Sequence, residues 1–212
     1  MSKREDTRQR ILEAARVLLE SAPGAPVSMS EIAAAAGVTR QLLYFHFENR
    51  TALLLELGRL IDAGARTPEL QATIDNARDG RAALKAAVRV QAAIKPKIRG
   101  VVTSLELLRP IDDAAAAACE EREDARLERC RAVIDRLAAE GRLAPGWRRE
   151  TAAELLWSMT SLRAWEDLVH RRGWTDGGWI RWTTAALEAA LVPEGARRMP
   201  GPRPATEKAG TS

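Results

Sequence analysis

The chain has 212 residues, a formal net charge of +4 and a sequence pI near 9.5, which allows one large domain or a small domain followed by a larger one. It has one Tyr and two Phe beside six Trp, and it is rich in Ala, Leu, Arg and Glu, so we expect an all-α protein. No apolar run reaches the roughly 18 residues of a membrane span, and the polar start Met1–Asp6 does not resemble a signal peptide. We therefore expect a cytoplasmic protein whose mild basic excess favours a polyanionic partner.

The first two predicted helices lie before Gly37. Apolar residues at helical spacing predict a helix over about residues 7–21, which the segment Ala22–Pro26 ends. Ser28–Glu31 matches a capping box, so a second helix is predicted to begin near Met29. Gly37 is expected to close this short helix, because glycine readily adopts the left-handed backbone of a helix C-terminus.

A third helix completes a helix-turn-helix over residues 28–57. Thr39 can cap this helix, which is expected to reach Phe47, and Asn49 can cap a fourth. Small or apolar residues occupy the positions where the second and third helices must touch: Ile32, Ala33, Ala36, Val38 and Leu43. The solvent side of the third helix carries residue types that suit a major groove, since Arg can pair with guanine and Gln with adenine.

This segment resembles the tetracycline-repressor (TetR) family of transcription regulators. The resemblance is carried by Ile32-Ala33, Ala36-Gly37-Val38, Leu43-Tyr44-Phe45-His46-Phe47, Asn49-Arg50 and Leu53-Leu54. It implies a homodimer that binds double-stranded DNA at a palindromic operator, with a ligand pocket in the C-terminal domain. Repression released by the ligand is the function that we expect from this resemblance.

The resemblance also assigns a set of DNA contacts by position. They lie at the start of the second helix, along the third and at the start of the fourth: Ser28, Thr39, Arg40, Gln41, Leu42, Tyr44, His46 and Arg50. Base reading is implied for residues 39–41 and phosphate contact for Tyr44, His46 and Arg50. Arg50 stands where the family usually has Lys, and Leu42 stands where it usually has a small residue.

The aromatic residues of the third helix have an alternative role as core. For Phe47 we expect burial. For Tyr44 we expect DNA contact, because its hydroxyl suits a phosphate oxygen.

Longer helices with short breaks are predicted beyond about residue 66. They cover approximately residues 81–93, 98–109, 113–140, 149–172 and 176–191. Thr67-Pro68 marks a break, Lys95-Pro96 a kink or a boundary, and Gly141 a helix end. From Pro193 the composition shifts to Pro, Gly, Arg, Lys, Thr and Ser, and we expect a disordered tail. The predicted domains are therefore 1–50, 51–192 and the tail 193–212.

The last two predicted helices are apolar on more than one face. A surface helix needs only one apolar stripe, so the second stripe predicts a subunit interface. We expect a two-fold homodimer through these helices, with Leu187 pointing outward into the interface.

A ligand site is predicted among the C-terminal helices. Apolar walls around residues 101–108 and 155–165 suit a mostly apolar effector, with Leu105, Trp157 and Met159 as candidate lining residues. Polar residues at Thr103, Glu106 and Ser158 are expected inside the same region. Two alternatives stay open: a constitutive DNA-binding dimer without an effector, and an enzyme or scaffold that borrows the fold.

Signals of catalysis or of a cofactor are absent from the sequence. It has no Gly-rich phosphate loop and no His-Glu-x-x-His or Cys-x-x-Cys motif. The two histidines, His46 and His170, are too isolated for a metal site. Cys119 and Cys130 are predicted to lie about 16 Å apart along one helix, as reduced thiols. An intersubunit disulfide or a redox sensor is the alternative.

Overall fold

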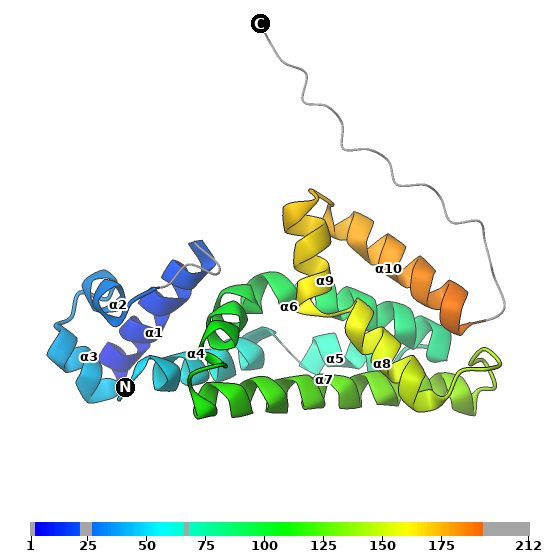
Figure 1. The fold of residues 1–212 in the computed structure, drawn as a ribbon, viewed down its shortest axis with the longest axis horizontal. Coiled ribbons are helices and arrows are strands. Elements are labelled where there is room, and N and C mark those ends of the chain that lie inside the picture. Colours follow the sequence, from blue (N-terminus) through cyan, green and yellow to red (C-terminus); the bar gives the residue numbers. More distant parts are fainter. Residues whose placement is uncertain (1–2, 22–26, 66–67, 193–212) are drawn as a thin grey trace, which may run out of the picture. The chain divides into compact units, whose positions relative to one another are not determined.

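The computed structural model describes residues 3–21, 27–65 and 68–192, and these residues form helices and no strands. The predicted all-α class is therefore confirmed. In chain order the helices are α1 Lys3–Ser21, α2 Met29–Ala35, α3 Arg40–His46, α4 Arg50–Ala65, α5 Pro68–Asp75, α6 Gly80–Leu108, α7 Asp113–Ala139, α8 Arg149–Met159, α9 Leu162–Trp165, the π-helix η1 Glu166–Arg171, and α10 Asp176–Leu191 (Figure 1). The predicted break at residues 22–26 and the predicted tail from Pro193 lie outside the described residues.

The chain divides into two compact units. One consists of the chain up to Thr67 together with Ala93–Ala125, and the other of Pro68–Ala92 together with the chain from Arg126 onward. Helices α6 and α7 each contribute a part to both units. The predicted domain limits at residues 50 and 192 stay a prediction.

The first unit is organised around α1. This helix contacts α2 and α4, and α2 contacts α3. Its buried residues Ile11, Leu12, Ala15 and Leu19 recur at three- and four-residue spacing, which places them on one face. Gly100 of α6 lies against the end of this helix, since a Cβ built there would come within 2.5 Å of the Leu19 carbonyl oxygen. At this point the backbones of α1 and α6 are in direct contact, and only glycine fits without a shift.

The second unit has a core of aliphatic side chains and tryptophans. Trp165 and Trp179 are almost completely buried in it. The Trp165 indole N–H donates to the Asp176 carboxylate at 2.9 Å, so the polar edge of this buried ring has its partner. The Ala144 N–H donates to the Leu191 carbonyl at 2.8 Å and ties the end of α10 to the loop after α7.

Two predicted helix limits were wrong, and one helix was missed. Helix α6 continues through Pro96, because the exposed proline removes one N–H while the buried residues Ile94 and Ile98 hold the helix on either side. Helix α5 was not predicted from the sequence; it begins at Pro68, at the predicted break, where a missing N–H costs no helical hydrogen bond. The single helix predicted over residues 149–172 is interrupted after Met159, since the Ser161 hydroxyl accepts the Ala164 N–H and starts a new helix.

The outward position predicted for Leu187 was also wrong. Four residues of α10 at four-residue spacing are buried within the chain itself: Trp179, Thr183, Leu187 and Leu191. This stripe faces the core of the second unit. The opposite side of α10 carries the half-buried Trp182 and the exposed Ala189, so a second apolar side remains, but Leu187 is not part of it.

Candidate nucleic-acid interface

Helix α2 is bounded by two local hydrogen-bonding motifs. The Ser28 hydroxyl accepts the Glu31 N–H at 3.2 Å, and the Glu31 carboxylate accepts the Ser28 N–H at 2.7 Å, which is the predicted capping box. At the other end Gly37 has a φ of 63°, and its N–H donates to the Ala34 carbonyl. The Val38 N–H donates to the Ala33 carbonyl, which completes a Schellman turn. The predicted turn of the helix-turn-helix is confirmed.

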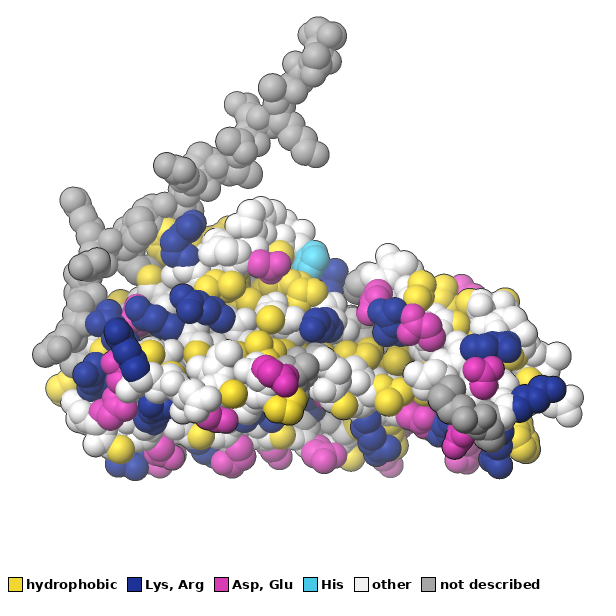
Figure 2. Space-filling view, turned by 180° about the vertical axis from the view of Figure 1, so that it is seen from behind, with side chains coloured by type: hydrophobic (Ala, Val, Ile, Leu, Met, Phe, Trp, Pro, Cys, Tyr) yellow, Lys and Arg dark blue, Asp and Glu magenta, His cyan; other side chains and the backbone are white. Residues whose placement is uncertain are grey.

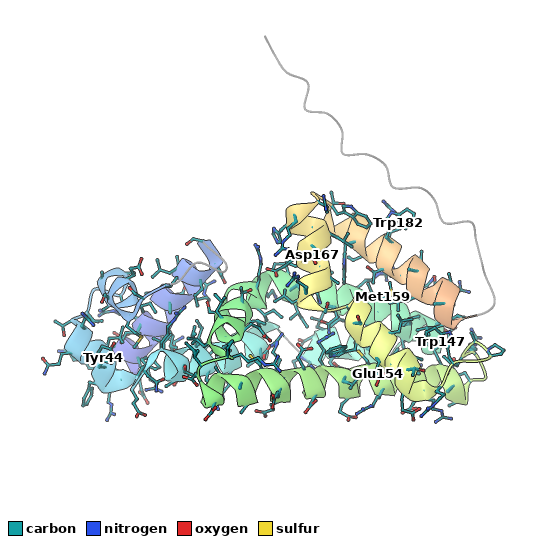
Figure 3. The ribbon with its side chains drawn as sticks, viewed as in Figure 1. Tyr44, Trp147, Glu154, Met159, Asp167 and Trp182 are labelled. Atoms are coloured by element: carbon teal, nitrogen blue, oxygen red, sulfur yellow. The ribbon has the colours of Figure 1, made fainter. Side chains whose placement is uncertain are left out.

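Helix α3 turns one side to the core and the other to solvent. Leu43 and Phe47 are buried, as predicted for Phe47, and they hold the helix to the unit. The solvent side carries predicted DNA contacts, all of them exposed: Arg40, Gln41, Leu42 and Tyr44. Figure 3 labels Tyr44 on this helix, and its side chain is 44% exposed. The structure thus brings together, on one free surface, the side chains that could reach a major groove.

Thr39 has a structural task besides any contact with DNA. Its hydroxyl oxygen accepts the Leu42 N–H at 3.1 Å and caps α3. The hydroxyl proton remains available as a single donor. One donor suits a phosphate oxygen better than it suits a base, which is recognised by several donors and acceptors together.

Two arginines of α1 hold the helix-turn-helix in place, and sequence reasoning missed both. Arg8 forms a two-pronged ion pair with Glu56 of α4, donates to the His46 carbonyl at 3.0 Å, and lies over the Phe47 ring at 4.6 Å. Arg10 donates to the Ala36 carbonyl at 2.8 Å, at the turn. These contacts join residues that are far apart in the sequence, so no local sequence pattern predicts them.

His46 and Arg50 lie at the edge of the exposed surface and are half-buried. Burial lowers the pKa of His46 first, and the charges of Arg4 and Arg8 lower it further, so the imidazole is neutral near pH 7. Arg50 is the first residue of α4. Within the described residues, the buried Nη2 of its guanidinium has no hydrogen-bond partner. A phosphate oxygen would supply that partner.

Helix α4 is linked to the first part of α7 at two points. The Thr51 hydroxyl donates to the Asp112 carboxylate at 2.6 Å, and Arg122 pairs with Asp62 at 3.2 Å. The Thr51 hydroxyl and the Ala115 N–H hold the pKa of Asp112 below its usual value. Because α4 directly follows α3, a shift of this part of α7 would reach the exposed helix through α4.

The surface charge is mixed, in keeping with the small net charge. On the face seen in Figure 2, basic and acidic side chains lie interspersed with apolar ones. Across the described ranges, no group of three or more His, Cys, Asp or Glu is placed to hold a metal ion. None of the described helices is both long enough and apolar enough to cross a membrane.

The predicted effector residues fall into different units. Leu105 is buried in the first unit, whereas Trp157 and Met159 are half-buried in the second, so a pocket shared by all three stays a prediction. The interior position expected for Glu106 and Ser158 was wrong, because both side chains are exposed.

The buried polar groups are different ones. Ser104 is completely buried, and Arg126 is buried with its guanidinium 4.8 Å from the centre of the Trp157 ring. Arg126 also donates to the Trp157 carbonyl at 2.6 Å. The sequence analysis did not single out Arg126, whose burial depends on packing between helices.

Comparison with known proteins agrees with this geometry. Residues 11–57 match the family described as bacterial regulatory proteins, tetR family. A curated relative, the HTH-type transcriptional regulator AcrR of Shigella flexneri, is 37% identical over 67 residues, which are 32% of this chain and 31% of the relative. The chain thus matches less than a third of that relative's length.

Two solved structures share the fold over nearly the whole chain. NalD, the secondary repressor of the MexAB-OprM multidrug efflux pump in Pseudomonas aeruginosa, has a TM-score of 0.65 at 23% identity, covering 91% of this chain and 99% of that one. A putative transcriptional regulator from Saccharomonospora viridis, solved in complex with choline, has a TM-score of 0.75 at 18% identity, covering 89% and 98%.

The matched family and the curated relative are regulators and not enzymes, in agreement with the prediction from the sequence. The capped helices, the Gly37 turn and the exposed side of α3 are the structural counterpart of that match. The helix-turn-helix region of this chain, residues 11–57, is therefore similar to the tetR family of bacterial regulatory proteins.

Proposed function

We propose that this protein is a cytoplasmic repressor that binds a palindromic operator as a homodimer and leaves it when a mostly apolar small molecule binds. The observation that carries the DNA-binding part is that α3 is buried on one side and exposed on the other. Leu43 and Phe47 are almost fully buried, while Arg40, Gln41 and Tyr44 are free to solvent. A helix so anchored presents a fixed set of donors and acceptors, as direct readout of bases requires.

DNA contacts divide into base reading and backbone anchoring. Arg40→Ala or Gln41→Ala should lose about 1–3 kcal/mol of discrimination at particular base pairs. Arg50→Ala should weaken binding to all sequences alike and reduce the salt dependence by about one unit per half-site. Titrations of selected and mixed-sequence duplexes at several salt concentrations measure both effects. The proposed roles are inverted if Arg50→Ala changes base preference while Arg40→Ala does not.

Dimerisation is proposed through the outer sides of the last two long helices, α8 and α10. Trp182 lies half-buried on the side of α10 opposite its core stripe, 6.4 Å from the ring of Trp174. In a two-fold interface one substitution enters twice, so Trp182→Arg should give monomers that lose operator affinity. Leu187→Arg would be unsuitable, because it places a charge in the core of the chain itself. Light scattering decides: a clean wild-type monomer at micromolar concentration contradicts the proposal.

Release is proposed to act through the spacing of the two α3 helices. In a dimer they must lie about 34–36 Å apart to enter successive major grooves. The Thr51–Asp112 and Asp62–Arg122 contacts support a path by which movement of α7 shifts α4. DNA and effector would then oppose each other with a coupling of about 1–3 kcal/mol.

The chemistry of the effector is suggested by Trp157. Its indole N–H is buried and, among the described residues, has no acceptor. An apolar molecule with one acceptor oxygen would satisfy it, whereas an unpaired buried donor is costly. The choline complex among the similar folds supports small-molecule sensing, although it does not identify the effector here.

A thermal-shift screen of apolar metabolites and drugs, followed by operator release, tests the sensing. An effector should raise the melting temperature and weaken DNA binding. Trp157→Phe keeps an aromatic ring, although a smaller one, and loses the N–H, so it should weaken the binding of an acceptor-bearing effector and leave effector-free DNA binding intact. If no compound both stabilises the protein and releases DNA, the constitutive dimer is the better account.

A further inference from the structure

A second basic group lies beside the exposed side of α3, outside the helix-turn-helix itself. The Arg4 guanidinium lies 5.1 Å from the centre of the Phe45 ring. Phe45 is 64% exposed, more than any other large apolar side chain of α1–α4. It stands four residues after Gln41 and three after Leu42, so the three side chains share one side of the helix. Arg4 therefore borders the surface proposed to read DNA.

Arg4 and Arg8 are one helical turn apart, yet their surroundings differ. Arg8 is committed to the fold by its ion pair with Glu56 and its bond to the His46 carbonyl. Arg4 is exposed, and among the residues that the structure describes no carboxylate pairs with it. Its charge still reaches the end of α3, since it contributes to the lowered pKa of His46. One arginine thus holds the fold, and the other keeps its donors free.

The Phe45 ring limits where this free guanidinium can be. A cation over an aromatic face gains about 0.5–1 kcal/mol at an exposed site. The contact restricts a side chain that would otherwise lose rotamer freedom on binding. It leaves the N–H groups at the edge of the guanidinium plane available to an anion, because the ring occupies only its face.

We infer that Arg4, positioned by Phe45, is a further contact to the phosphate backbone of DNA, beside the contacts expected from the helix-turn-helix. Phosphate is the DNA group that this geometry suits, because a guanidinium binds phosphate oxygens with paired N–H donors. The contact carries no base preference, since the phosphate is the same at every step. This inference rests on the proposed DNA-binding function.

The test compares four variants on one probe. Arg4→Gln removes the charge, Phe45→Leu removes the aromatic face, and the double variant removes both. Arg16→Gln is the matched control, because Arg16 lies about 18 Å further along the same helix and is paired with Glu13 and Glu20. The probe is a mixed-sequence duplex of about 30 base pairs, three turns of DNA, so the operator need not be known. Anisotropy titrations over a fourfold range of salt give the affinity and its salt slope.

Arg4→Gln should reduce the salt slope by about 0.9 per subunit, so a fourfold rise in salt costs about 3.5-fold less affinity per subunit than in wild type. Phe45→Leu should lose part of the same affinity, and the double variant should be no weaker than Arg4→Gln. Arg16→Gln should retain the wild-type slope. The melting temperature of Arg4→Gln should fall by no more than about 1–4 °C, because the side chain is exposed and its contact with the Phe45 ring is worth only about 0.5–1 kcal/mol.

Two results would overturn the inference in different ways. If Arg4→Gln binds like wild type while Arg50→Ala is weakened, Arg4 is no contact, and the proposed function stands. If the losses of Arg4→Gln and Phe45→Leu add in full, Phe45 does not position Arg4. Wild-type protein that binds neither the mixed duplex nor any selected sequence would instead end the proposed function and this inference together.

Discussion

Gly100→Ala tests the contact between α6 and the end of α1. A Cβ at this position would meet the Leu19 carbonyl oxygen at 2.5 Å, its carbonyl carbon at 2.7 Å and its Cβ at 3.0 Å. An ordinary carbon–oxygen contact needs about 3.3 Å or more, so the two backbones must separate by nearly 1 Å. Two of the three atoms met are backbone, and neither can rotate away.

The expected cost is that of overpacking, about 1–3 kcal/mol. An alanine inside a helix also gains up to about 1 kcal/mol over glycine, and a matched variant removes this term. Gly64→Ala serves, because it lies in α4 and a Cβ there would meet no atom within 4 Å. For a chain of this size 1 kcal/mol corresponds to about 2–4 °C, so the two variants should differ by about 2–12 °C in melting temperature.

Differential scanning calorimetry of both variants and wild type gives the comparison. Gly64→Ala should melt at or above wild type, and Gly100→Ala below it. DNA affinity should fall with Gly100→Ala as well, since α1 also holds the turn through Arg10. Equal melting temperatures for the two variants would refute the close contact, because the strain is then relieved without cost.

Three further predictions concern titratable groups. The pKa of His46 is lowered in the folded chain, so as the pH falls the unfolded chain binds a proton at this residue before the folded chain does. The free energy of unfolding should therefore be greatest above about pH 7 and fall towards pH 5. His46→Gln should reduce this pH dependence, as measured by urea unfolding. The pKa of Asp112 is lowered by the Thr51 hydroxyl, so that contribution is present above about pH 4 and lost below it; Thr51→Val should raise the pH of acid unfolding followed by circular dichroism. Burial raises the pKa of the Cys119 thiol to about 11, so a disulfide reagent at about pH 8 should label it only after unfolding, and rapid labelling of the folded protein would favour the redox alternative.

The helix-turn-helix was largely predictable because its signals are local. Ser28 and Glu31 lie three residues apart, and Thr39 bonds to the N–H three residues on. The positive φ of Gly37 follows from the residue type, because glycine readily adopts the left-handed backbone conformation. Motifs of this span form wherever the chain is helical around them, so their sequence pattern determines them.

The errors lay where distant packing decides. Two apolar stripes on α10 did not reveal that Leu187 faces the chain's own core, because an apolar stripe fits a core and a subunit interface equally well. Of the kink or boundary predicted at Pro96, the boundary was wrong, because buried neighbours on both sides hold the helix through it. Arg8 and Arg10 went unassigned for the same reason, because their partners lie outside α1. The core role considered for Phe45 was wrong, because its side chain is 64% exposed.

The contacts of Arg8 with α3 and α4 limit where the protein can be truncated. Helix α3 has seven residues, too few to persist alone in water, and the carbonyl of its last residue is satisfied from α1. A synthetic peptide of the helix-turn-helix alone should therefore be unstructured, and a transplant of DNA specificity into another scaffold must carry α1 with it. A purification tag fused ahead of Met1 would end four residues before Arg4, close to the surface proposed to bind DNA. Purification handles therefore belong at the other end of the chain.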